Sequence, residues 1–147
     1  MPTIQFHVMT DSQPDAHLRH ACRIAEEAVA SGQRVFVRVA DAAQLKRMDE
    51  LLWTFGDRSF LPHEIANTQN YVPTNEHVRV LIGADAALTT DMVINLGIDA
   101  PNEFESLKQI IELVPADDER KRLARQRFKH YRDAGIEPTT QNVLRKE

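Results

Sequence analysis

The chain has 147 residues and a net charge of −4, and 42% of its residues are hydrophobic and 27% charged. This length suffices for one domain with a substantial core, and the small net charge provides no overall case for nucleic-acid binding. The single cysteine, Cys22, excludes an internal disulfide and fits a reducing cytoplasm. The first residues predict a strand, and no apolar run approaches the roughly 20 residues of a membrane helix. We therefore expect a cytoplasmic protein without a signal peptide or membrane segment.

The first half of the chain alternates predicted strands and helices. Residues 3–9 and 33–40 have the β-branched and aromatic content of strands. Residues 14–31 have apolar side chains at helical spacing, and a second helix is predicted to end near Trp53. In residues 57–77 the apolar side chains have neither helical nor strand spacing, and two prolines occur, so we expect a long loop there.

The second half continues this alternation. Residues 78–82 and 92–96 are short apolar strands, and a short helix is expected over 102–107. Residues 109–114 favour a fifth strand, although a continuing helix fits the same residues. A basic helix follows, and residues 136–147 form a polar tail.

Strands that alternate with helices predict an α/β fold. We expect one domain over residues 1–135, with a mostly parallel sheet of about five strands and helices on both faces. The tail of residues 136–147 would lie outside this domain.

The basic helix, residues 117–134, is the most unusual part of the sequence. From Arg120 to Arg132 it has seven Lys and Arg residues and no acidic residue, which leaves 11 basic and 22 acidic residues, a net −11, in the rest. Asp117 or Asp118 can cap its start, and Gly135 suits the left-handed position after its end.

Helical spacing divides this helix into two faces. The residues expected to pack on the domain are Leu123, Ala124, Tyr131 and Ala134. The cations on a neighbouring stripe are Lys121, Arg125, Lys129 and Arg132, and Phe128 lies on the border between the two faces. Such a stripe can be simply a solvated surface. Because residues 120–132 contain no acidic residue and the stripe has an aromatic edge, we favour a binding surface for a ligand that is both anionic and apolar.

The usual catalytic and cofactor motifs are missing. The turn after the first predicted strand has no glycine, and no phosphate-binding loop motif occurs, so nucleotide binding is not expected. His17 and His20 have a spacing that could hold a metal, but no third ligand is apparent. Cys22 lies on an apolar helix face, where a buried thiol is expected. We predict no catalytic residue, no metal and no cofactor.

A second notable stretch covers residues 48–66. It places Trp53, Phe55 and Phe60 near a helix end and a loop, in a chain with few aromatic residues. These side chains could be ordinary core. They could equally be anchors for a protein partner, for which exposed aromatic residues are suited.

Together these two stretches resemble the chi subunit family of bacterial DNA polymerase III holoenzyme. The motifs that carry the resemblance are D-E-x-L-W at 49–53, S-F-x-P-H at 59–63, V-P at 114–115, L-A-R-x-R at 123–127 and K-x-Y-R-x-A-G at 129–135. They occur in order in a chain of similar size, and the similarity extends over nearly the whole length. The resemblance implies a Rossmann-like three-layer fold and a non-catalytic adaptor.

In that family, the adaptor links the clamp-loader assembly to single-stranded DNA-binding protein by gripping the acidic C-terminal tail of that protein. The positions that match the family's tail-binding residues are Val114, Lys121, Arg125, Phe128 and Lys129. Chi proteins often have Tyr where this chain has Phe128, so ring stacking would persist without a hydroxyl hydrogen bond.

The family's second partner is the psi subunit of the clamp-loader assembly. The resemblance implies that psi, or another partner, contacts Trp53 and Phe60. Two alternatives come from other classes of protein: direct nucleic-acid binding by helix 117–134, and a small α/β enzyme with an unrecognised site.

Overall fold

The computed structural model describes residues 2–55, 61–66, 71–84 and 90–143. Its strands are β1 (Thr3–Met9), β2 (Val35–Arg38), β3 (His63–Ile65), β4 (Val80–Gly83), β5 (Met92–Asn95), β6 (Gln109–Val114) and β7 (Thr139–Val143). Its helices are α1 (Ala16–Ala30), α2 (Ala42–Thr54) and α3 (Asp118–Asp133), with a 3₁₀ turn, η1, at Phe104–Ser106.

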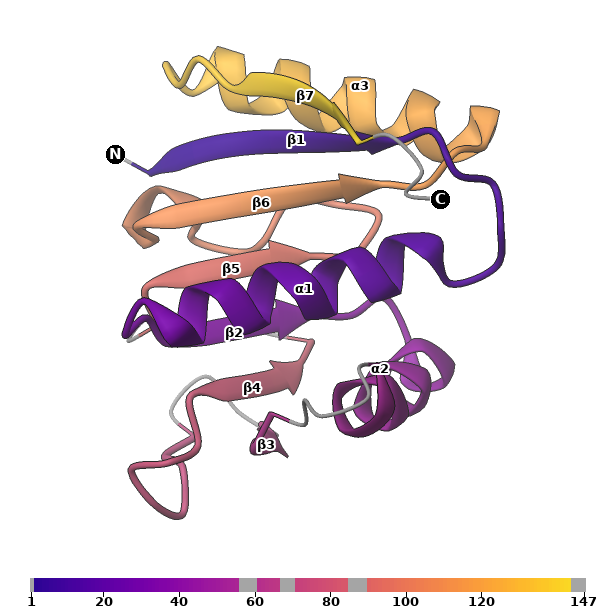
Figure 1. Cartoon of the computed structure of the whole chain (residues 1–147). Coiled ribbons are helices and arrows are strands. Elements are labelled where there is room, and N and C mark those ends of the chain that lie inside the picture. The colour runs from indigo at the N-terminus through magenta and orange to yellow at the C-terminus, as the bar shows by residue number, and fades with distance from the viewer. Residues whose placement is uncertain (1, 56–60, 67–70, 85–89, 144–147) are drawn as a thin grey trace.

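The strands form one sheet in the order β3-β4-β2-β5-β6-β1-β7, and every pairing is parallel. Helices α1 and α2 lie on one face of this sheet, and α3 lies on the other (Figure 1). The predicted Rossmann-like, three-layer α/β fold is confirmed.

Side-chain alternation along the strands builds two separate cores. Val35 and Val37 of β2 pack under α1 and α2, whereas Phe36 points to the opposite face. In β6, Ile110 and Val114 belong to the core beneath α3. Both faces are covered by helices, which explains why the inner strands are apolar at nearly every position.

Residues 109–114 form strand β6, so the strand interpretation of this segment is confirmed over the helical one. The strand pairs along its whole length with β1 on one side, and residues 110–112 pair with β5 on the other. The short helix predicted over 102–107 is a single 3₁₀ turn, Phe104–Ser106.

Two strands lie where no strand was predicted, which brings the sheet to seven strands. Within the expected loop of residues 57–77, His63–Ile65 form β3 and pair with β4. Within the expected tail, Thr139–Val143 form β7 and pair with β1. Both are edge strands, and β7 is polar and exposed along most of its length, so neither shows the apolar pattern by which strands are recognised.

Candidate functional site

Helix α3 has the ends that its sequence predicts. The Asp117 side chain accepts a hydrogen bond from the Arg120 backbone N–H at 2.9 Å and caps the first turn. At the other end Gly135 has φ +89°, and the N–H of Ile136 reaches back to the carbonyl of Tyr131 at 3.1 Å. These contacts satisfy backbone groups that a helix terminus leaves free.

Two neighbouring residues of α3 fix its rotation about its own axis. Arg127 points toward β6, where its Nε lies 3.0 Å from Oε1 of Glu112. Phe128 points toward β1, where its ring centroid lies 5.3 Å from that of Phe6. The helix therefore has one flank over β6 and another over β1, the strand that neighbours β7.

The cationic stripe lies on the flank that carries Phe128. Lys121, Arg125 and Lys129 are solvent-accessible, and none of them forms an ion pair with another described residue. Arg132, the fourth member, has Glu137 at 3.6 Å. The stripe therefore offers three cations that form no ion pair within the part of the chain that the structure describes.

A surface depression of about 550 Å³ opens along this flank. The residues that line it are Arg125, Phe128, Lys129, Arg132 and Asp133. Of the predicted site residues, the structure thus brings together Arg125, Phe128 and Lys129, while Lys121 lies one turn toward the start of the helix. Val114 is only 1% exposed and belongs to the apolar cluster against which Phe128 packs.

Arg127 is a buried residue beside the candidate site that the sequence patterns did not identify. It is 6% exposed and paired with Glu112, which is fully buried in the middle of the sheet. Tyr131 donates to Oε2 of Glu112 at 2.5 Å, and Asn95 Nδ2 donates to both carboxylate oxygens at 3.0 Å. Burial raises the pKa of Glu112, and the charge of Arg127 with these hydrogen bonds acts in the opposite direction.

The same network continues across the sheet to β2. Asn95 accepts a hydrogen bond from Arg38 Nη1 at 3.0 Å, and Arg38 Nη2 pairs with Asp99 at 2.8 Å. A sequence signal for this network did exist. Glu112 interrupts an apolar strand, and a buried carboxylate requires charged or hydrogen-bonding partners. Arg127 has helical spacing to both Ala124 and Tyr131 on the packing face.

The aromatic patch on the other side of the molecule is centred on Trp53. This side chain is 47% exposed, and its ring lies 4.3 Å from that of His63. His63 is held by Asp49 at 2.6 Å and by the Leu61 carbonyl at 2.6 Å. Ile65 is 40% exposed on the same edge strand, β3. Phe60, the other predicted partner residue, lies outside the described residues.

Comparison with known proteins decides the family. Residues 1–139 match the family described as "DNA polymerase III chi subunit, HolC". The chain belongs to the DNA polymerase III chi subunit family. That match includes every candidate residue named above.

Three relatives named DNA polymerase III subunit chi support the assignment. The protein of Pseudomonas aeruginosa is 33% identical over 135 residues, which cover 92% of both chains. That of Haemophilus influenzae is 33% identical over 96% of this chain and 97% of its own. That of Escherichia coli is 31% identical over 81% of this chain and 80% of its own. The chain is therefore a member of a family of DNA replication subunits.

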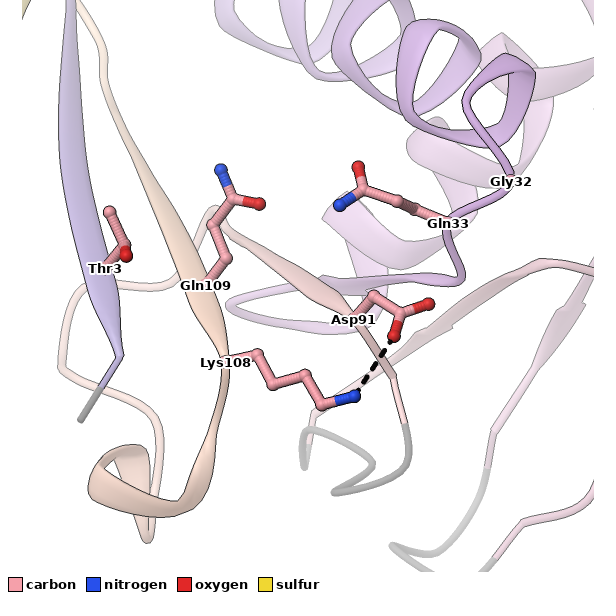
Figure 2. Close-up of a pocket in the computed structure, with 6 residues that line it drawn as sticks. All are labelled: Thr3, Gly32, Gln33, Asp91, Lys108 and Gln109. Atoms are coloured by element: carbon pink, nitrogen blue, oxygen red, sulfur yellow. Dashed lines mark hydrogen bonds and ion pairs between the residues drawn. The ribbon is translucent and has the colours of Figure 1, made fainter.

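A further depression, of about 570 Å³, lies at the amino-terminal edge of the sheet of this chi-family chain. Its lining residues, drawn in Figure 2, are Thr3, Gly32, Gln33, Asp91, Lys108 and Gln109. Asp91 pairs with Lys108 at 3.4 Å and accepts the Arg34 backbone N–H at 2.8 Å, which together with the nearby charges lowers its pKa. Open α/β sheets bind ligands at the opposite, carboxyl-terminal edge, so this depression adds no case for a substrate site.

At the carboxyl-terminal edge, the small depression between the starts of α1 and α3 is acidic. Asp11, Asp15 and Asp117 are among its lining residues. Three carboxylates at this place disfavour a phosphate, which chains of this fold class hold there with glycine-rich turns.

The remaining candidate groups have structural partners. His20 is bonded to His7, with 2.9 Å between their ring nitrogens. Within the described ranges, no group of three His, Cys, Asp or Glu residues could hold a metal. Cys22 is fully buried, as its place on the helix face predicted, and burial raises the pKa of its thiol to about 12. No helix among the described residues is both long and apolar enough to cross a membrane.

Proposed function

We propose that this protein is a non-catalytic replication adaptor that grips the acidic C-terminal tail of single-stranded DNA-binding protein. By binding this tail, it links single-stranded DNA-binding protein to the clamp-loader assembly of DNA polymerase III. The observation that carries the proposal is the flank of α3, where Arg125, Lys129 and the half-buried Phe128 surround one depression. Membership in the chi family supplies the biological setting.

The grip combines three physical contributions. Arg125 forms a charge-assisted hydrogen bond with the terminal carboxylate of the tail, a geometry that guanidinium groups favour. The Phe128 ring provides a fixed apolar wall for the terminal aromatic side chain, because it is held from beneath by Phe6. Lys121 and Lys129 attract the acidic residues that precede the terminus and speed the encounter.

Val114 contributes indirectly. As a buried member of the cluster beneath Phe128, it supports the ring and offers almost no surface to a ligand. An interface of this small size is expected to bind with a Kd near micromolar, about −8 kcal/mol. Several tails on one DNA-bound partner would raise the effective affinity.

The decisive test is binding of a fluorescent acidic peptide that ends in Asp-Asp-Ile-Pro-Phe. We expect near-micromolar binding that is lost when the peptide's C-terminus is amidated. Arg125→Ala should weaken binding by about 2 kcal/mol, the typical contribution of a charged hydrogen bond. Its unfolding midpoint in urea should be unchanged, because the side chain is exposed.

Three results would contradict this proposal. Equal binding of the free and amidated peptides would reduce the stripe to a nonspecific cationic surface. Unchanged binding by Arg125→Ala would remove the central residue. Tight binding of single-stranded DNA without peptide, with a steep dependence on salt, would favour direct nucleic-acid binding by α3.

We also propose that Trp53 anchors a second partner, the psi subunit where it is present. Its 47% exposure and its contact with the constrained ring of His63 support an anchor over a core residue. Phe60, the second residue that the family resemblance assigns to this partner, is part of the same proposed surface.

Trp53→Ala should keep the urea midpoint close to that of the wild type and weaken binding of the partner, measured by calorimetry. The peptide of the previous test is the control, because its site on α3 is distinct and its affinity should not change. Loss of the folded state in this variant would instead make Trp53 a structural residue.

A further inference from the structure

Among the residues that the structure describes, strand β7 has a neighbouring strand on one side only. It pairs with β1 on one side and is the last strand in the sheet order. Natural edges are usually shielded by charged side chains, prolines or very short strands. Residues Thr139–Val143 contain neither charge nor proline and form five residues of strand, directly after Pro138. The opposite edge, β3, has only three residues, directly after Pro62.

The direction of the backbone groups in β7 follows from one hydrogen bond. The N–H of Thr10 donates to the carbonyl of Val143 at 3.1 Å, so the backbone groups of Val143 face β1. In a strand, both backbone groups of a residue point to one side, and the side alternates from residue to residue. Thr140 and Asn142 therefore present their N–H and C=O groups to the open side.

This open edge lies beside the cationic flank of α3. Thr140 is paired with Phe6, and the Phe6 ring contacts Phe128. Because paired residues of parallel strands share a face, the side chains of Thr140 and Asn142 lie on the α3 face of the sheet. Arg132 of α3 is also 3.6 Å from Glu137, just before β7. Figure 1 shows α3 running behind β1 and β7.

We propose that β7 receives the extended acidic peptide as an additional strand, with Thr140 and Asn142 supplying backbone hydrogen bonds. The inference rests on the proposed function, because it concerns the same peptide at the same flank of α3. The chain terminus would enter the depression at Phe128, and the preceding residues would run along β7. Alternate peptide side chains would then point toward α3, where acidic ones meet Lys121, Arg125 and Lys129.

Charge complementarity favours this occupant over a second copy of the chain. Two copies that joined their β7 edges in one continuous sheet would place both α3 helices on the same face. Their cationic flanks would then lie next to each other and repel. An acidic peptide carries the opposite charge, so the cationic flank of α3 attracts it.

Backbone N-methylation of the peptide tests strand addition directly. The acidic peptide ending in Asp-Asp-Ile-Pro-Phe is methylated at one non-proline amide at a time, since proline has no N–H, and each Kd is measured by fluorescence anisotropy. Methylation at alternate residues should weaken binding by about tenfold or more, because those amides bond to β7. Methylation at the intervening residues should leave Kd within about twofold, because those amides point to solvent.

On the protein side, Asn142→Pro removes one outward N–H and keeps the strand's bonds to β1, since proline is tolerated on an edge. We expect about a tenfold rise in Kd, and a much smaller rise for the matched control Asn142→Ala, which retains the backbone N–H. Circular dichroism and the urea midpoint establish that both variants are folded. If Asn142→Pro unfolds, exchange of the Thr140 and Asn142 amides in the wild type, measured by NMR, should slow when peptide is added.

The outcomes separate this inference from the proposed function. If amidation and Arg125→Ala abolish binding but no single N-methylation matters, the tail grip stands and strand addition is overturned. If the unmodified peptide does not bind, both are overturned. A concentration-dependent dimer that Asn142→Pro disperses, with no effect of N-methylation, would assign the edge to a second copy and also overturn the inference.

Discussion

Two arginines of α3, separated by a single residue, show how strongly position decides the role of one side-chain type. Arg125 is exposed beside the depression, whereas Arg127 is buried and bonded to Glu112 and to the carbonyl of Ile98 at 3.0 Å. A step of two residues turns the helix by roughly 200°, enough to move a side chain from the solvent flank to the sheet. Arg127 thus orients the helix that presents Arg125.

This difference predicts opposite effects on stability. Arg127→Met leaves the Glu112 carboxylate buried without its cation, which should cost about 3–5 kcal/mol of unfolding free energy. Arg125→Met, the matched control, should change it by no more than about 0.5 kcal/mol. Urea denaturation of both variants measures the two values. Equal and small losses would show that Arg127 does not anchor α3.

Among the elements, α3 has both of its ends set by local residues. The Asp117 side chain caps it by accepting the Arg120 N–H, and Asp118 and Glu119 lie in the first turn, where the helix dipole favours negative charge. The edge strands are the contrasting case, because β3 and β7 exist only through pairing with β4 and β1.

Removal of the cap should therefore destabilise the protein in a residue-specific way. Asp117→Ala is expected to lower the unfolding free energy by about 1 kcal/mol, while Asp117→Asn, which can still accept the hydrogen bond, should lose much less. Thermal and urea unfolding compare the two. Identical losses would mean that the charge of Asp117, and not its hydrogen bond, stabilises α3.

At the scale of the whole molecule, the distribution of charge and the burial of His7 and, in part, of His17 matter most. Residues 120–132 are set against a remainder with a net charge of −11, so the cationic flank is a local feature of an otherwise acidic protein. Burial lowers the pKa of His7, and burial together with the charge of Arg120 lowers that of His17, from an ordinary 6.5. Both side chains therefore bind a proton less readily in the fold than in the unfolded chain.

The sign of the resulting pH dependence follows from linkage. Below about pH 6.5 the unfolded chain binds protons at these histidines that the folded chain resists, so the unfolding free energy should fall as the pH falls. Above that pH the contribution is complete. Urea denaturation between about pH 7.5 and 5.5 should show this slope, and a His7→Gln/His17→Gln variant should show a flatter one. An equal slope in both proteins would attribute the effect to other groups.

The sequence by itself determined the local parts of this protein. The period of the apolar residues predicted α1, α2, α3 and the inner strands, because these elements bury one face or both. Helical spacing also placed Arg125, Phe128 and Lys129 on one flank, since residues three and four apart share a helix surface. The motifs around Trp53 and after Val114 predicted the family.

Only the tertiary structure decided what depends on residues distant in the chain. It paired Glu112 with Arg127 and buried Val114 beneath Phe128. It also turned a polar tail segment into β7, whose residues have no apolar pattern and gain their strand conformation from the backbone of β1. A local pattern records which face of an element is buried. The partner that satisfies a buried charge or an open edge is a property of the assembled sheet.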